Sequence, residues 1–174
     1  MEILIALLRG INVGGNNILP MTELKMLCEE TGFKNVCTYI QSGNVIFESK
    51  VPGEKAAVKL QNALKSKLDN PVAVMIRTVE ELETIISNNP FPGANPSQVG
   101  VLFLEKIVDK SIVQEFVKKE TEEIIIGKRE IYIHYPEGMG TSKLKFPKSA
   151  KNGTVRNINT VKKLALLANK IKSD

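Results

Sequence analysis

The hydrophobic pattern of the first 76 residues predicts an alternation of strands and helices. Residues 2–8 form a nearly continuous apolar run, which is typical of a central strand covered on both faces. The predicted elements are a strand at 2–8, a helix at 21–31, strands at 36–40 and 45–47, a helix at 54–68 and a strand at 72–76. This is the order of a ferredoxin-like, or split βαβ, subdomain with an antiparallel sheet.

The second half of the chain repeats part of this order. Thr78-x-x-Glu81 is a capping box and predicts a helix that ends near Asn88. The next stretch, 89–97, holds three prolines and a glycine and predicts a boundary. Further predicted elements are a strand at 99–104, a helix at 110–120, a hairpin of strands at 123–126 and 130–135, and a basic helix at 159–172. We therefore expect an α+β protein of two ferredoxin-like or βαββ subdomains, 1–88 and 98–174.

The charge distribution adds a functional expectation. The net charge of +5 is uneven, because residues 141–174 hold nine basic residues against one acid and the first 140 residues carry −3. A basic end on a mildly acidic body predicts an anionic partner, a nucleotide or RNA. The alternative is a solvated, lysine-rich terminal helix.

Other classes of protein are disfavoured by the sequence. No apolar run approaches the roughly 18 residues of a membrane helix, and the start lacks the basic region of a signal peptide. Cys28 and Cys37 form no CxxC pair, so we expect reduced thiols, a cytoplasmic location and no membrane partner. With His134 as the single histidine, we expect no metal site and no cofactor. The sequence does not predict the oligomeric state.

The loop after the first strand is the first candidate site. Arg9 ends the strand, and a guanidinium there can bind a phosphate or carboxylate, or it can pair with Glu23 or Glu48. In the following loop, 10–17, glycines allow positive φ and backbone N–H groups can converge on an anion. Candidate ligand residues in it are Asn12, Gly14 and Gly15. The loop matches neither GxGxxG nor a P-loop, and the alternative is a long turn whose Asn side chains bond to its own backbone.

Two further segments supply candidates. In the hairpin turn 41–44, Gln41 and Asn44 would contact a ligand if they project toward Arg9; otherwise they only form the turn. Arg156 lies just before the last predicted helix. A cation there is unfavourable, because the helix N-terminus carries a partial positive charge, unless an anion lies between them. Arg156 and Asn157, joined by Lys143 from the preceding loop, therefore form the sharpest candidate for an anion pocket.

Evidence for catalysis is sparse in the sequence. His134 lies on a predicted strand and is the single candidate for a general acid or base. Ser42 has no neighbouring base that would make it a nucleophile. Whether the protein is an enzyme stays open at this point.

Three segments together resemble a known family. They are ALLRGINVGG at 6–15, TYIQSGNVIF at 38–47 and TVRNINTVKKL at 154–164. In this order they resemble a bacterial domain-of-unknown-function family, which implies an α+β fold of two small subdomains and no established activity. Relatives often carry Lys where this chain has Asn16 and Trp where it has Ile158. The first difference weakens a phosphate-gripping role for the loop, and the second removes an aromatic platform for a base.

These observations lead to one leading hypothesis and two rivals. The leading hypothesis is a protein that binds a phosphate-bearing ligand, a nucleotide or RNA, in a cleft between the subdomains, lined by Arg9, the Gly14-Gly15 loop and Arg156-Asn157. The second is a small metal-independent enzyme of unknown reaction. The third is a structural or interaction protein in which Arg9 or Arg156 is buried against carboxylates.

Overall fold

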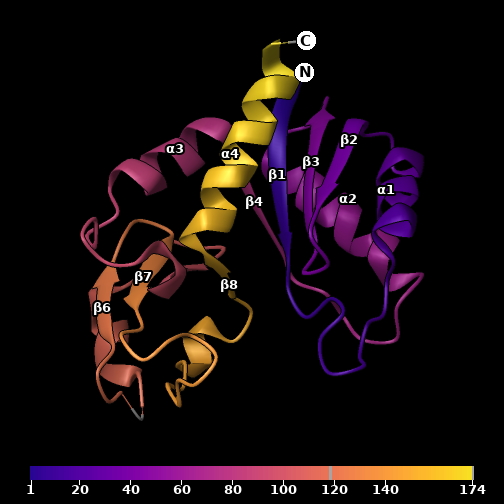
Figure 1. Ribbon diagram of the computed structural model, residues 1–174. Helices are drawn as coiled ribbons and strands as arrows, with labels where there is room; N and C mark the ends of the chain where they lie inside the picture. Colours follow the sequence, from indigo (N-terminus) through magenta and orange to yellow (C-terminus); the bar gives the residue numbers. More distant parts are fainter. Residues whose placement is uncertain (118, 174) are drawn as a thin grey trace. The chain divides into compact units, whose positions relative to one another are not determined.

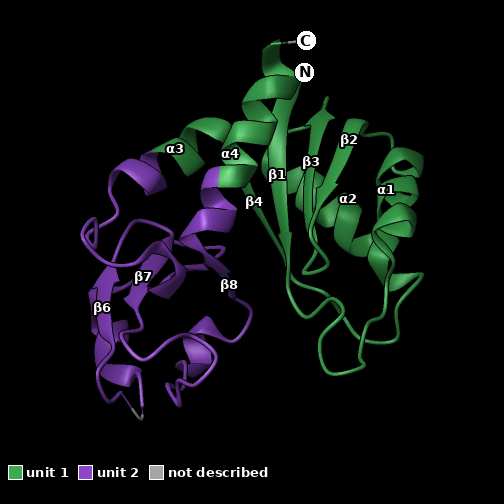
Figure 2. Ribbon diagram, viewed as in Figure 1, with its two compact units in different colours: residues 1–83, 163–174 green, residues 84–162 purple. Residues whose placement is uncertain are grey.

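The chain forms two compact units, shown in different colours in Figure 2. The computed structural model describes residues 1–117 and 119–173. Unit 1 consists of residues 1–83 and 163–174, and unit 2 of residues 84–162. The end of the chain, expected with the second subdomain, thus groups with the first unit.

Unit 1 is built on a four-stranded antiparallel sheet (Figure 1). The strands lie in the order β2-β3-β1-β4, so β1 is bonded to β3 on one side and to β4 on the other. Their bounds are Glu2–Leu8 for β1, Lys34–Tyr39 for β2, Asn44–Ser49 for β3 and Val74–Thr78 for β4. The two helices are α1, Met21–Glu30, and α2, Gly53–Lys65. Each predicted element of this half is present, with ends that differ by a few residues.

The helices α1 and α2 share one hydrophobic core with the sheet. Alternate residues of β1 (Leu4, Ala6 and Leu8) belong to this core, because successive side chains of a strand point to opposite faces. The helices contribute Leu24, Leu27 and Cys28 from α1 and Ala56, Leu60 and Leu64 from α2. The intervening residues of β1, Ile5 and Leu7, are also fully buried. The apolar run of β1 thus reflects burial on both faces.

The capping box predicted at Thr78 opens helix α3, Val79–Ser87. The backbone N–H of Thr78 donates to Glu81 Oε2 at 2.9 Å, and that of Glu81 donates to Thr78 Oγ1 at 3.2 Å. Each side chain satisfies a backbone donor of the other residue, as the motif predicts. Acids of α3 also bind the end of α4, Ile158–Ser173, through Lys172 Nζ to Glu80 Oε1 and Asn169 Nδ2 to Glu83 Oε1, both at 2.8 Å.

Unit 2 is built on a second four-stranded antiparallel sheet, in the order β6-β7-β5-β8. Its strands are β5, Val99–Phe103; β6, Glu123–Ile126; β7, Glu130–His134; and β8, Thr154–Asn157. Its core includes Leu102 of β5 and Ile131 and Ile133 of β7. The α+β class and the pair of βαββ-like antiparallel subdomains are therefore confirmed.

Two predictions for unit 2 were wrong. The helix expected at 110–120 is a short 3-10 helix, η2, Lys110–Glu115, and Lys118 lies outside the described residues. Asp109 caps its start, and Val117 instead pairs with Lys145 in an isolated bridge. Residues 154–157, read as the approach to the last helix, form β8 paired with β5. Four residues show too little alternation to be identified as a strand without their partner.

We expect Thr78→Ala to lower the free energy of unfolding by about 1 kcal/mol, because Glu81 loses its capping acceptor. Thr78→Ser keeps the hydroxyl and serves as the matched control, with a loss below about 0.5 kcal/mol. Urea unfolding followed by circular dichroism measures both. Equal stability of the two variants would contradict the role of the capping box.

Candidate functional site

The loop between β1 and α1 is a small hairpin held in left-handed backbone conformations. Five of its residues have positive φ: Gly10, Asn12, Gly14, Gly15 and Asn17. The N–H of Asn16 donates to the carbonyl oxygen of Val13 at 3.1 Å across the two glycines. Positive φ at both central residues is typical of a type I′ turn, so Gly14 and Gly15 form its tip. Three of these residues are glycines, which adopt positive φ readily, so backbone strain in the loop is confined to Asn12 and Asn17.

The side chain of Asn12 fastens this loop to its surroundings. Its Nδ2 donates to the carbonyl oxygens of Leu19 and Gln41, both at 2.9 Å, and its Oδ1 accepts from the N–H of Leu19 at 2.8 Å. Both N–H groups of the carboxamide are therefore used within the chain. Asn12 thus joins the two ends of the loop to the turn between β2 and β3.

That turn packs closely against the end of β1. The N–H of Leu8 donates to the carbonyl oxygen of Gly43 at 2.8 Å. A Cβ on Gly43, where φ is 82°, would lie 3.0 Å from Leu8 Cβ and 3.2 Å from Ile11 Cβ. In the same turn Ile40 has a φ of 51°, which is rare for a β-branched residue. The fully buried Asn44 donates to Tyr39 O and Ser42 Oγ.

Arg9 directly follows β1, and its side chain is exposed. Its backbone is fixed, because its N–H donates to the carbonyl oxygen of Ala73 at 2.9 Å. Within the described part of the chain, its guanidinium forms no ion pair and no hydrogen bond, so the pairing with Glu23 or Glu48 considered above does not occur. An exposed guanidinium at a rigid strand end can bind an anion through two parallel N–H groups. Gln41, also exposed, contributes its carbonyl to the bond with Asn12.

Asn17 adds an acceptor that the sequence analysis did not single out. Its Oδ1 is buried and has no donor among the residues that the structure describes. A buried acceptor of this kind needs an N–H or O–H from a ligand or from water. Asn tolerates the left-handed conformation it adopts here, and the Asn-Asn pair after two glycines was the available signal.

In contrast to Arg9, the candidate arginine of unit 2 is buried. Arg156 is 8% exposed, and its Nη1 donates to Thr154 Oγ1 at 2.7 Å and to the carbonyl oxygen of Val155 at 2.9 Å. Burial lowers the pKa of its guanidinium to about 10, so it remains charged at neutral pH. Arg77 is its counterpart in unit 1: it is 1% exposed, pairs with the central strand and donates to the carbonyl oxygen of Ile76 at 2.8 Å.

The residue after each buried arginine caps a helix. Asn157 Oδ1 accepts from the N–H of Asn159 at 2.8 Å, and its Nδ2 donates to the carbonyl oxygens of Pro96 and Ser97. Thr78 holds the equivalent place in unit 1. At both strand-to-helix junctions a buried arginine is therefore followed by a capping residue and then by the helix. This local arrangement accounts for the positions of Arg156 and Asn157. Lys143 is exposed in the loop before β8, and its contact with a ligand stays a prediction.

The described residues provide limited evidence for catalytic chemistry. His134 Nδ1 lies 3.3 Å from Glu123 Oε1, and its ring lies 5.3 Å from that of Phe91. Burial raises the pKa of the Cys28 thiol to about 12, which keeps it protonated and unreactive at neutral pH. Within 1–117 and 119–173, no group of three or more His, Cys, Asp or Glu residues could hold a metal ion.

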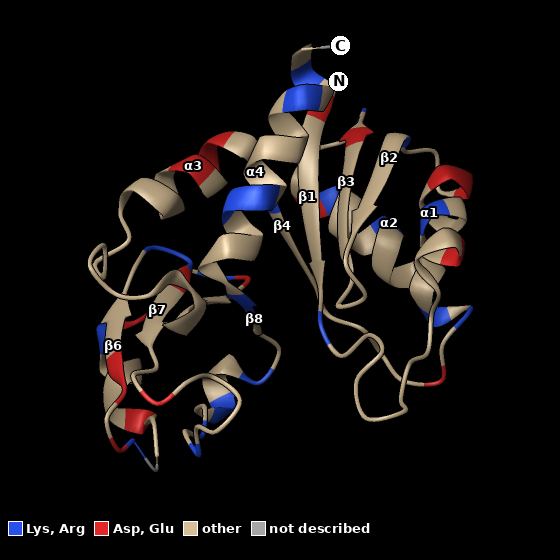
Figure 3. Ribbon diagram, viewed as in Figure 1, with Lys and Arg blue, Asp and Glu red and all other residues tan. Residues whose placement is uncertain are grey.

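Figure 3 shows acids on α1 and α3 and basic residues on α4. Four lysines of α4 are exposed: Lys162, Lys163, Lys170 and Lys172. Lys172 is paired with Glu80, and this hydrogen bond lowers the pKa of the carboxyl. No described helix has the length and apolar character needed to cross a bilayer.

Comparison with known proteins identifies the family. The profile described as "Protein of unknown function (DUF1697)" matches residues 1–132, and the chain belongs to this family. No curated protein sequence matches the chain. Among solved structures, it is similar to the conserved bacterial protein SP0830 from Streptococcus pneumoniae, with 23% sequence identity and a TM-score of 0.76. That match covers 96% of this chain and 98% of the other, and it shows a shared fold.

We expect Asn12→Ala to lower the free energy of unfolding by about 2–3 kcal/mol, since three hydrogen bonds of about 1 kcal/mol each are lost. The matched control is Asn16→Ala, whose carboxamide makes a single 3.5 Å contact with Gly14 O, and its loss is below about 0.5 kcal/mol. Chemical denaturation measures the difference. Similar losses in the two variants would show that Asn12 does not fasten the loop.

Proposed function

We propose that this member of the DUF1697 family binds a phosphate-bearing ligand, a nucleotide or RNA, at the end of β1. The observation that carries the proposal is the exposed guanidinium of Arg9, which has no partner among the described residues although its backbone is fixed at the end of the central strand. Arginine is suited to phosphate because its planar fork matches two phosphate oxygens. Because the Arg9 guanidinium forms no ion pair among the described residues, ligand binding does not have to break one.

The strain of the adjoining loops supports a binding role. Asn12, Asn17 and Ile40 all adopt positive φ, and such residues persist only where the surrounding contacts hold them. The Asn12 carboxamide and the close packing of Gly43 supply that support. A loop held in this way loses little conformational entropy when a ligand binds.

Asn17 supports a ligand that presents donors as well as an anion. Its buried Oδ1 would accept from a hydroxyl or amino group of the ligand, and a nucleotide or RNA carries both groups beside its phosphates. In this proposal Asn12, Asn44, Arg156 and Asn157 stabilise the fold rather than contact the ligand, because their side chains are engaged within their own units. Free cysteines fit the reducing cytoplasm, where such ligands are abundant.

The test compares Arg9→Ala with a second cation at the far end of the sheet. ATP, a sugar phosphate, inorganic phosphate and a short RNA are titrated into wild type, Arg9→Ala and Lys34→Ala, with binding followed by calorimetry and thermal shift. We expect Arg9→Ala to lower affinity for the bound ligand at least about tenfold, the loss of one charge-assisted contact. Its own melting temperature should change little, because the side chain is exposed. Lys34→Ala should bind as wild type does.

The outcomes separate the ligands and the roles of the two arginines. A steep fall of affinity with salt identifies RNA, and a shallow one identifies a nucleotide. Arg156→Ala should lower the melting temperature while leaving affinity unchanged, because its guanidinium is buried. If no phosphate compound stabilises wild type, or if Arg9→Ala binds equally well, the proposal fails.

A further inference from the structure

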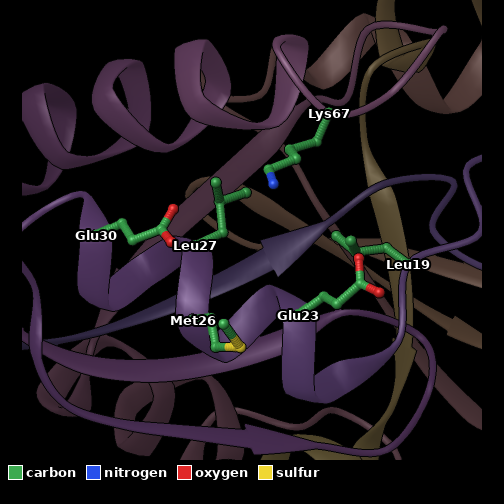
Figure 4. A pocket seen from close by; sticks show the side chains of 6 residues that line it. All are labelled: Leu19, Glu23, Met26, Leu27, Glu30 and Lys67. Carbon is green, nitrogen blue, oxygen red and sulfur yellow. The ribbon is translucent and has the colours of Figure 1, made fainter.

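A second feature of unit 1 is a pocket beside α1, shown in Figure 4. Its volume of about 340 Å³ lies within the range of small-molecule sites. Leu19 comes from the end of the loop that Asn12 fastens, and Lys67 follows α2. The six lining residues are Leu19, Glu23, Met26, Leu27, Glu30 and Lys67.

The residues that α1 contributes to the pocket lie on one face of the helix. Glu23, Met26, Leu27 and Glu30 are spaced at i, i+3, i+4 and i+7, which places them on the same face of α1. Leu27 and Leu19 are 6% and 3% exposed and form an apolar floor. Met26 is 57% exposed, so an adaptable apolar side chain stands in water at the edge of this floor. A ligand with an aliphatic part would cover it.

Three charged groups stand around the same floor. In Figure 4 the Lys67 ammonium points toward Leu27, with the carboxylates of Glu30 and Glu23 on either side. Among the described residues, none of these three side-chain charges forms an ion pair or a hydrogen bond. Separate, unpaired charges of both signs are complementary to a ligand that also carries both signs.

We infer that this pocket binds a small zwitterion with an aliphatic portion, of which a free α-amino acid such as leucine is the simplest example. The ligand's ammonium would lie between Glu23 and Glu30, its carboxylate on Lys67, and its side chain on Leu19, Leu27 and Met26. Two carboxylates against one ammonium disfavour a ligand with net negative charge. The site is therefore distinct in chemistry from the anion contact at Arg9 and does not rest on it.

The test removes one ligand charge at a time. Amide resonances of the full chain are followed by NMR during titration with L-leucine, with N-acetyl-L-leucine, which lacks the ammonium, and with L-leucine methyl ester, which lacks the carboxylate. We expect saturable shifts at Leu19, Met26, Leu27 and Lys67 with L-leucine, and affinities about tenfold lower for each derivative.

Variants assign each charge to its partner. Lys67→Met should weaken L-leucine about tenfold but leave the methyl ester unaffected, whereas Glu23→Gln and Glu30→Gln should each weaken both ligands. Lys65→Met, an exposed lysine outside the pocket, is the matched control and should bind as wild type does. Arg9→Ala should also bind L-leucine normally, which separates this site from the proposed phosphate site. The inference is wrong if L-leucine leaves these resonances unmoved at millimolar concentrations or if N-acetyl-L-leucine binds equally well.

Discussion

The pairing of β1 on both sides is the constraint on which unit 1 depends. Its residues face β3 along one edge and β4 along the other, and Leu4–Leu8 are all fully buried. Both edges of β1 are hydrogen-bonded and both of its faces are packed, so the strand has no free edge or face along which to shift. Whatever follows Leu8 therefore starts from a rigid position. This explains how an exposed arginine and the loop after it can be held in one place at the end of the central strand.

The same arrangement recurs in unit 2 with fewer helices. In both sheets the first strand is central, between the third and the fourth, and the fourth leads directly into a helix. Each fourth strand carries a buried arginine, Arg77 or Arg156, that donates to the carbonyl oxygen of the residue before it. A capping residue, Thr78 or Asn157, follows. An arginine that recurs in this structural position is better explained by the junction than by a ligand of one unit.

The roles of the asparagines show why residue type alone is a weak guide to a site. Asn12, Asn44 and Asn157 were predicted to contact a ligand, yet their N–H groups donate to backbone carbonyl oxygens of their own units. Asn17, which was not chosen, has a buried acceptor with no partner among the described residues. Which carboxamide is free depends on carbonyl groups that lie up to 61 residues away along the chain. Partners this far away along the chain cannot be identified from the neighbouring residues in the sequence.

The sequence by itself determined the α+β class, the order of elements in unit 1, the capping box at Thr78 and the position of Arg9 at the end of β1. These follow from periodicity, turn residues and short-range hydrogen bonds, which act over a few neighbouring positions. The tertiary structure alone decided that 154–157 is a strand, that 110–115 is a 3-10 helix, that Arg156 is buried while Arg9 is exposed, and that residues of α1 line a pocket together with Leu19 and Lys67. Strand pairing, burial and the lining of a pocket depend on residues distant in sequence, which local patterns do not encode.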